Sequence, residues 1–199
     1  MFDSILPIGG TCNITFLLQN TEIKKQTTLF EWFISPNLRD ITEILIKIAN
    51  NQDKDIIQQK DKNIYIGDSI YSSHYTLENF KPIYERRRNR LKDLILSSKK
   101  ILCCRFESTP IEYENDDIDN FIKSIRMIND NILEVKVLLI TPGIELEHLS
   151  LIKVLYNNHD IDPYCESNEI KYLFLKMLKK IGYDINDTVT LSFDDKSEF

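Results

Sequence analysis

Glycine is scarce in this sequence, with 5 residues among 199, and long apolar runs are absent. A membrane-spanning helix needs about 20 consecutive apolar residues, so a membrane is not an expected partner. The N-terminal segment "MFDSILPIGG" has neither the basic start nor the apolar centre of a signal peptide. Basic residues are also in the minority, and the net charge is −6. Nucleic acid is therefore not an expected partner, since its binding requires a basic surface that neutralises phosphates.

Cysteine is present at four positions, but no two cysteines form a C-x-x-C pair. The spacing therefore does not predict a zinc site, and we expect no metal and no cofactor. Cys103 and Cys104 are neighbours in a predicted strand, where successive side chains point to opposite faces. Cys12 and Cys165 lie far from them in the sequence. We predict that all four are free thiols in a reducing, cytoplasmic protein.

Short apolar runs alternate with helical stripes along the whole chain. The alternation predicts an α/β fold in a single domain over residues 1–199, with a mostly parallel sheet and helices on both faces in three layers. Strands are predicted at 5–8, 63–66, 99–108, 133–141, 149–158 and 187–193, with an extended aromatic segment at 27–35. Helices are predicted from about Thr11, from Asn37, and over 80–95, 118–128 and 170–181. The polar residues 50–63 are predicted to form a loop or a loose helix end.

Two of the five glycines, Gly9 and Gly10, stand together between an apolar run and Cys12. Reactive groups of parallel sheets gather where a strand ends and the next helix begins. The N–H groups of a helix start lower the pKa of a thiol there, and those of Cys12 and Asn13 would bind a negatively charged oxygen. The alternative interpretation is that Cys12 is a small core residue in a strand-to-helix turn.

A nucleophilic cysteine needs a base, which is usually histidine. His74 lies in a loop between a predicted strand and a long helix, whereas His148 and His159 lie in polar connections. A loop histidine is also a common surface residue, so the sequence alone leaves each role open. Ser69, in the turn "GDS", is a weaker nucleophile candidate of the serine-esterase type.

Two further segments lead to structural expectations. Trp32, the only tryptophan, has apolar neighbours in "LFEWFIS" and is predicted to be largely buried near the Cys12 turn. The basic cluster "YERRRNRLK" at 84–92 is predicted to be a solvated helix face.

Four of these segments, in this order, resemble a family of papain-like cysteine peptidases defined as a domain of unknown function. The opening "ILPIGGTCNITFLLQ" is similar to the family's strand, Gly-rich turn and cysteine, and "LFEWFIS" to its Phe-Asp-Trp element. The segment "SSHYTLENFKPIYERRRNRLKDLILSSKKILCCRF" is similar to its histidine loop, helix and following strand. The resemblance covers roughly residues 5–107.

The resemblance implies that Cys12 is the nucleophile and His74 its base, with Glu31 and Trp32 near the site. Glu31 replaces the aspartate of the family's element and would supply the carboxylate that orients His74, with Asp68 as a weaker candidate. Tyr75 follows His74 where the family often has aspartate or histidine.

Two functions remain open at this stage. The first is a cysteine-dependent hydrolase, peptidase-like or an acyl transferase, that acts on an amide or ester in a peptide, ester or protein substrate. The second is a non-catalytic α/β binding module that uses a pocket beside Cys12 and Trp32. The distance between Cys12 and His74 separates them, because a catalytic pair must lie within reach of a hydrogen bond.

Overall fold

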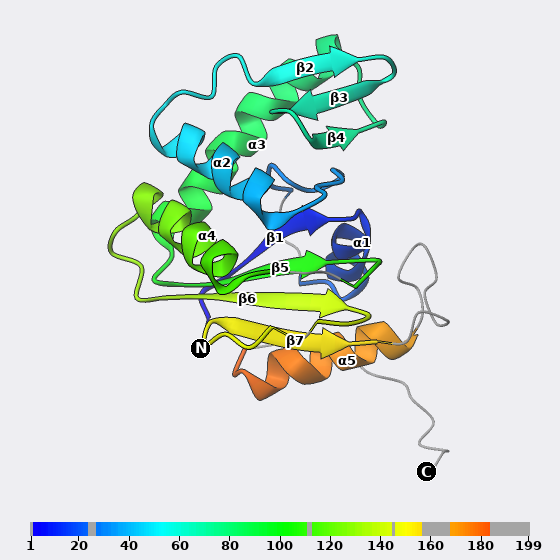
Figure 1. Cartoon of the computed structure of the whole chain (residues 1–199), viewed down its shortest axis with the longest axis vertical. Helices are drawn as coiled ribbons and strands as arrows, with labels where there is room; N and C mark the ends of the chain where they lie inside the picture. Colours follow the sequence, from blue (N-terminus) through cyan, green and yellow to red (C-terminus); the bar gives the residue numbers. More distant parts are fainter. Residues whose placement is uncertain (1, 24–26, 111–112, 145, 157–167, 184–199) are drawn as a thin grey trace.

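The computed structural model describes residues 2–23, 27–110, 113–144, 146–156 and 168–183 (Figure 1). Its helices are α1 (Asn13–Asn20), α2 (Leu38–Ala49), α3 (Leu77–Ser97), α4 (Asn115–Ile128) and α5 (Asn168–Lys180). Its strands are β1 (Ser4–Gly10), β2 (Ile57–Lys60), β3 (Asn63–Ile66), β4 (Ile70–Ser72), β5 (Lys100–Phe106), β6 (Glu134–Thr141) and β7 (Leu151–Leu155). The predicted strand at 187–193 lies outside the described residues, as do His159 and Cys165.

Four strands form a parallel sheet in the order β1-β5-β6-β7. The two central strands, β5 and β6, are apolar along most of their length because both of their faces are covered. Cys103 belongs to the core on one face of the sheet and Cys104 to the core on the other. The predicted α/β class and the parallel sheet are thus confirmed.

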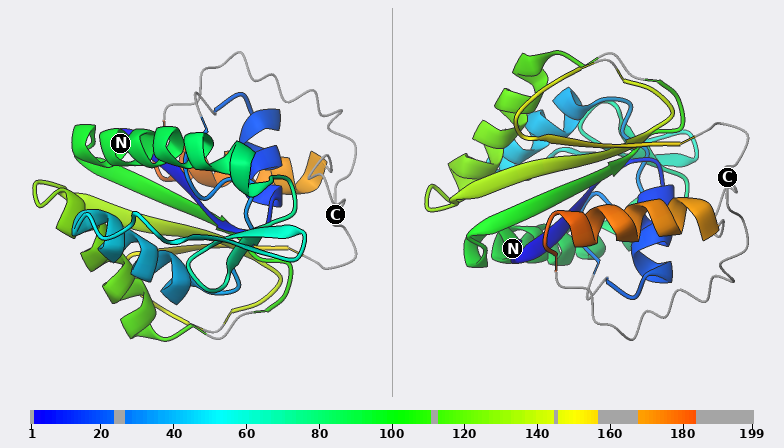
Figure 2. Two further views of the ribbon diagram at one scale, coloured as in Figure 1. Left: turned by 90° about the horizontal axis from the view of Figure 1, so that it is seen from above. Right: turned by 90° about the horizontal axis from the view of Figure 1, so that it is seen from below.

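The helices divide between the two cores. Helices α2 and α4 pack into the core that includes Cys103, whereas α1 and α5 pack into the core that includes Cys104. Figure 2 shows these two pairs on opposite sides of the sheet. Each helix follows its apolar stripe, as in α2, where Ile41, Leu45 and Ile48 are fully buried. Of the described helices, none has the length and apolar composition to cross a membrane.

A second, antiparallel sheet corrects two predictions. Strand β2 lies inside the segment predicted as a polar loop, and β3 continues through a turn at Gly67 into β4 rather than ending in a loop. The order of this sheet is β2-β3-β4. Three of the four residues of β2 are exposed, so the strand lacks the apolar alternation that would have identified it.

The aromatic segment 27–35 is also not extended as predicted. Residues 29–32 form turns, and only Ile34 pairs with a strand, as an antiparallel bridge to Tyr71 of β4. Trp32 has a φ of 67°, a left-handed conformation that is uncommon for a bulky residue. The segment therefore turns back sharply before it docks on β4.

Candidate functional site

The two adjacent glycines form the irregular end of β1. The register between β1 and β5 shifts between Pro7 and Gly10, and Gly9 and Gly10 have φ values of 77° and 88°. A Cβ on Gly10 would lie 1.9 Å from the backbone oxygen of Phe106. Both positions therefore require glycine for their positive φ, and Gly10 also requires it for its close approach to β5.

Cys12 lies at the start of α1, as its N-cap residue. Its carbonyl oxygen accepts hydrogen bonds from the N–H groups of Thr15 and Phe16, at 2.9 and 3.2 Å. The hydroxyl of Thr11 donates to the side-chain oxygen of Asn13 at 3.0 Å. The predicted strand, turn and helix therefore occur in this order, and α1 begins at Asn13 rather than at Thr11.

The structure brings together Cys12 and His74, which are 62 residues apart in the chain. His74 lies in the loop between β4 and α3, and its backbone N–H donates to the hydroxyl of Ser72 at 3.2 Å. The sulfur of the half-buried Cys12 is 3.9 Å from Nε2 of His74, whose side chain is exposed. Catalytic hydrogen bonds are often long in unliganded proteins, so this distance suits a thiol and its base.

Trp32 lies between helix α1 and His74. Its ring makes an edge contact with Phe16 of α1, with centroids 5.1 Å apart, and another with His74 at 5.9 Å. The residue has an intermediate exposure and lies beside the Cys12 helix, so it does not stand free on the surface, as the sequence predicted. It forms one wall against the His74 imidazole.

Glu31 is fully buried next to Trp32. One of its carboxylate oxygens accepts hydrogen bonds from the N–H and the hydroxyl of Thr28, at 2.5 and 3.2 Å. These contacts close the turn that presents Trp32. That Glu31 orients His74 stays a prediction.

The thiol of Cys12 has a raised pKa. Burial is the main cause, because it disfavours the thiolate, and the hydrogen bond from the residue's own backbone N–H opposes it only in part. The sequence analysis expected the helix start to lower this pKa. Desolvation outweighs that effect here, so the thiol needs a base to become nucleophilic.

Arg87 is a residue whose role the sequence analysis missed. It was counted within a solvated basic cluster, yet it is buried and donates to the Tyr75 hydroxyl at 2.8 Å and to the Glu31 backbone oxygen at 3.2 Å. It therefore ties the segment after His74 to the segment before Trp32. Its position on the apolar stripe of α3 was the available signal, since buried positions recur every three or four residues.

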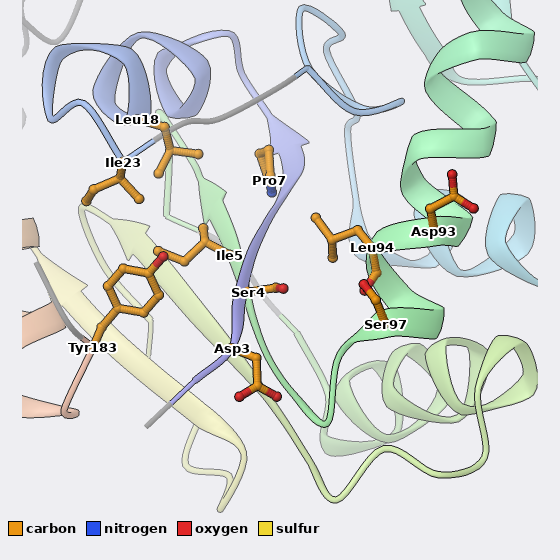
Figure 3. Close-up of a pocket in the computed structure, with 10 residues that line it drawn as sticks. All are labelled: Asp3, Ser4, Ile5, Pro7, Leu18, Ile23, Asp93, Leu94, Ser97 and Tyr183. Carbon is orange, nitrogen blue, oxygen red and sulfur yellow. The ribbon is translucent and has the colours of Figure 1, made fainter.

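The other candidates lie in different settings. Ser69 and Asp68 occupy the turn between β3 and β4, where Asp68 is exposed. His148 has its ring engaged near the start of β7, since Nε2 is 3.3 Å from Asp119 and Nδ1 accepts the N–H of Ser150 at 3.0 Å. A cavity of about 330 Å³ lies along β1 between α1 and α3, lined by residues such as Ile5, Leu18 and Leu94 (Figure 3). Its described lining does not include Cys12 or Trp32.

No protein family, curated protein or solved structure matches this chain. The functional interpretation therefore depends on the residues and contacts described above.

Proposed function

We propose that this protein is a cysteine-dependent hydrolase or acyl transferase that acts on an amide or ester bond. The observation that carries the proposal is the 3.9 Å distance between the Cys12 sulfur and Nε2 of His74 at the carboxyl end of a parallel strand. The resemblance to papain-like cysteine peptidases points to the same two residues and belongs to this proposal. We also propose that the protein is cytoplasmic and that its fold has three layers.

In the proposed reaction, His74 takes the proton of the Cys12 thiol, and the sulfur attacks the carbonyl carbon of the substrate. The carbonyl π electrons move to oxygen, which becomes an oxyanion. When the tetrahedral intermediate collapses, the bond to the leaving amine or alcohol breaks, and His74 donates its proton to that group. Attack by water on the thioester, with His74 again as base, releases the acid. Attack by an amine or alcohol instead transfers the acyl group.

The N–H groups at the start of α1 would stabilise the oxyanion. Cys12 precedes α1 directly, and the first N–H groups of a helix have no partner within the helix. Trp32 would hold the imidazole of His74 through their edge contact and would border the substrate. Glu31 would supply the carboxylate that orients His74, and it closes the turn that presents Trp32.

The raised pKa of Cys12 has a direct consequence for this mechanism. A thiol whose pKa is raised by burial is mostly protonated at neutral pH. Reaction there requires that His74 remove the proton, rather than that a permanent thiolate be present. The same raised pKa also favours the alternative function, a non-catalytic module that binds a peptide or other ligand beside Cys12 and Trp32.

The two functions differ in whether an acyl group is transferred to Cys12. We would mix the protein with p-nitrophenyl acetate and locate the acetyl group by mass spectrometry of the intact protein and its peptides. Acetylation of Cys12 that disappears in His74→Ala and persists in His148→Ala supports the catalytic pair. His148→Ala is the matched control because it removes a histidine whose ring is engaged elsewhere. Equal acetylation in both variants, or a wild type that neither acetylates Cys12 nor releases p-nitrophenol faster than His74→Ala, would favour the binding module.

A further inference from the structure

A fully buried arginine lies next to the Cys12 turn. Arg105, in β5, has an exposed fraction of 0%, and its carboxylate partner Glu107 is itself buried. Burying a guanidinium costs several kcal/mol unless its donors are satisfied. The buried guanidinium therefore needs several hydrogen-bond partners, and their positions indicate its structural role.

The guanidinium of Arg105 contacts three parts of the chain. Its Nε donates to the carboxylate of Glu107 and to the hydroxyl of Tyr113, the latter at 2.8 Å. One terminal nitrogen donates to the backbone oxygen of Ile8 at 3.1 Å and to the hydroxyl oxygen of Ser35 at 2.7 Å. The other donates to the backbone oxygen of Ser35 at 2.6 Å. Glu107 and Tyr113 accept hydrogen bonds from Nε of Arg105, while its terminal nitrogens bind Ile8 of β1 and Ser35.

Ser35 forms hydrogen bonds with both Arg105 and Gly10. The N–H of Gly10 donates to the Ser35 hydroxyl oxygen at 2.8 Å, and the N–H of Ser35 donates to the Gly10 backbone oxygen at 3.1 Å. Both polar backbone groups of Gly10 are thus held by one residue. Gly10 stands two positions before Cys12.

We propose that Arg105 and Ser35 are positioning residues that set the location of the Cys12 sulfur relative to His74. The inference rests on the proposed function, since it concerns the same thiol. Neither side chain takes part in a step of the proposed reaction. Both act through the backbone of the turn.

The break in the strand register explains why such residues are needed. In a regular parallel pair, the hydrogen-bond ladder fixes the end of a strand. Here the pairing of β1 with β5 shifts between Pro7 and Gly10, so Ile8 and Gly9 fall outside the regular register. The register resumes at Gly10, which pairs with Phe106, and the N–H of Thr11 donates to the Phe106 backbone oxygen at 3.1 Å. Arg105 takes the backbone oxygen of Ile8, and Ser35 takes the groups of Gly10. Side chains therefore reinforce the ladder at its irregular end, just before the nucleophile.

Ser35→Ala is the main test, because it removes one hydroxyl and leaves the charge of Arg105 with its other partners. We expect the rate of Cys12 alkylation by iodoacetamide at neutral pH to fall at least about tenfold, since small displacements of reacting groups are costly. The matched control is Ser124→Ala, which removes a buried hydroxyl of α4 that donates to the Phe121 backbone oxygen at 2.6 Å. Its Cys12 should react as in the wild type. Equal rates in Ser35→Ala and Ser124→Ala would overturn the proposal.

Amide hydrogen exchange supplies a second readout that does not depend on the chemistry. Exchange at Gly10 should accelerate at least about tenfold in Ser35→Ala and stay unchanged in Ser124→Ala, because an amide that loses its hydrogen bond exchanges through smaller openings. Unchanged exchange at Gly10 would also refute the proposal. If wild-type alkylation proves independent of His74, the proposed function fails, and Gly10 exchange still decides whether Ser35 holds the turn.

Arg105→Lys extends the test to the guanidinium. Lysine keeps the charge but lacks the planar fork that reaches Ile8 and Ser35 together. We expect alkylation of Cys12 to slow in this variant at least as much as in Ser35→Ala. A folded Arg105→Lys protein with wild-type alkylation would overturn the role of Arg105. If this variant does not fold, the results for Ser35→Ala decide whether the side-chain contacts to Gly10 position Cys12.

Discussion

Replacing Gly10 by alanine perturbs the Cys12 turn most directly, and the structure gives the scale of the effect. An L-residue at the φ of 88° found there pays about 1–2 kcal/mol of conformational strain. The new Cβ would also lie 1.9 Å from the backbone oxygen of Phe106 and 2.8 Å from its carbonyl carbon. A backbone carbonyl in a strand cannot rotate aside, so the ends of β1 and β5 must separate. Overpacking of this kind costs about 1–3 kcal/mol, which gives a total of about 2–5 kcal/mol.

Gly182→Ala is the control, because it shares the strain without the overlap. Gly182 has a φ of 73°, and no atom of the described residues lies within 4 Å of a Cβ built on it. We expect a loss of at most about 1–2 kcal/mol. Urea denaturation measures both variants against the wild type, as a lower midpoint at an unchanged slope. The folded Gly10→Ala protein should also alkylate Cys12 more slowly. Equal losses of stability in the two variants would refute the reasoning about Phe106.

Two further predictions concern the ion pair of Arg39 in α2 with Asp117 in α4, and the hydroxyl of Tyr75 next to His74. Burial works against a low pKa of Asp117, but hydrogen bonds from the Arg39 side chain and the Glu114 backbone N–H lower it overall. The stability gained from this carboxylate is therefore present above its unfolded pKa of about 3.9 and is lost as the pH falls through the folded pKa. Arg39→Ala should cost up to about 1 kcal/mol at pH 7 and progressively less in urea titrations below about pH 4; a constant difference down to about pH 2 contradicts this. Tyr75→Phe removes the hydroxyl that accepts a hydrogen bond from Arg87, so the substitution should destabilise the fold by about 1.5–3 kcal/mol. Tyr65→Phe is the control and should change the stability little. Equal melting temperatures of the two variants would refute the prediction.

The elements predicted correctly from the sequence are those whose apolar spacing is set by burial. Helices α2, α3, α4 and α5 follow stripes that recur every three or four residues, and β5 and β6 are apolar runs bounded by polar segments. Strand β2 has no such pattern, because its outward residues are polar on an edge. The turn at 29–32 was misjudged since its aromatic composition is typical of a strand.

The candidate site was predicted only where the chemistry is visible in residue types. Cys12 and His74 are recognisable as a nucleophile and a base, and Gly9 with Gly10 as a turn. Arg105 gives no such signal, because its partners Ile8, Ser35, Glu107 and Tyr113 come from three parts of the chain. The direction of the Cys12 pKa was also beyond the sequence, since it depends on how deeply the thiol is buried.

The pH dependence of Cys12 alkylation in the wild type and in His74→Ala tests the central claim most directly. Peptide mass spectrometry identifies the labelled cysteine, and Cys103 and Cys104 serve as internal references because burial raises the pKa of both thiols. The wild type should label Cys12 first at neutral pH. His74→Ala should slow this labelling at least about tenfold. Labelling should recover only at a pH above the ~8.5 pKa of a free thiol, since burial raises the pKa of the unassisted Cys12. Identical profiles for the two proteins would show that His74 does not activate Cys12 and would contradict the proposed function.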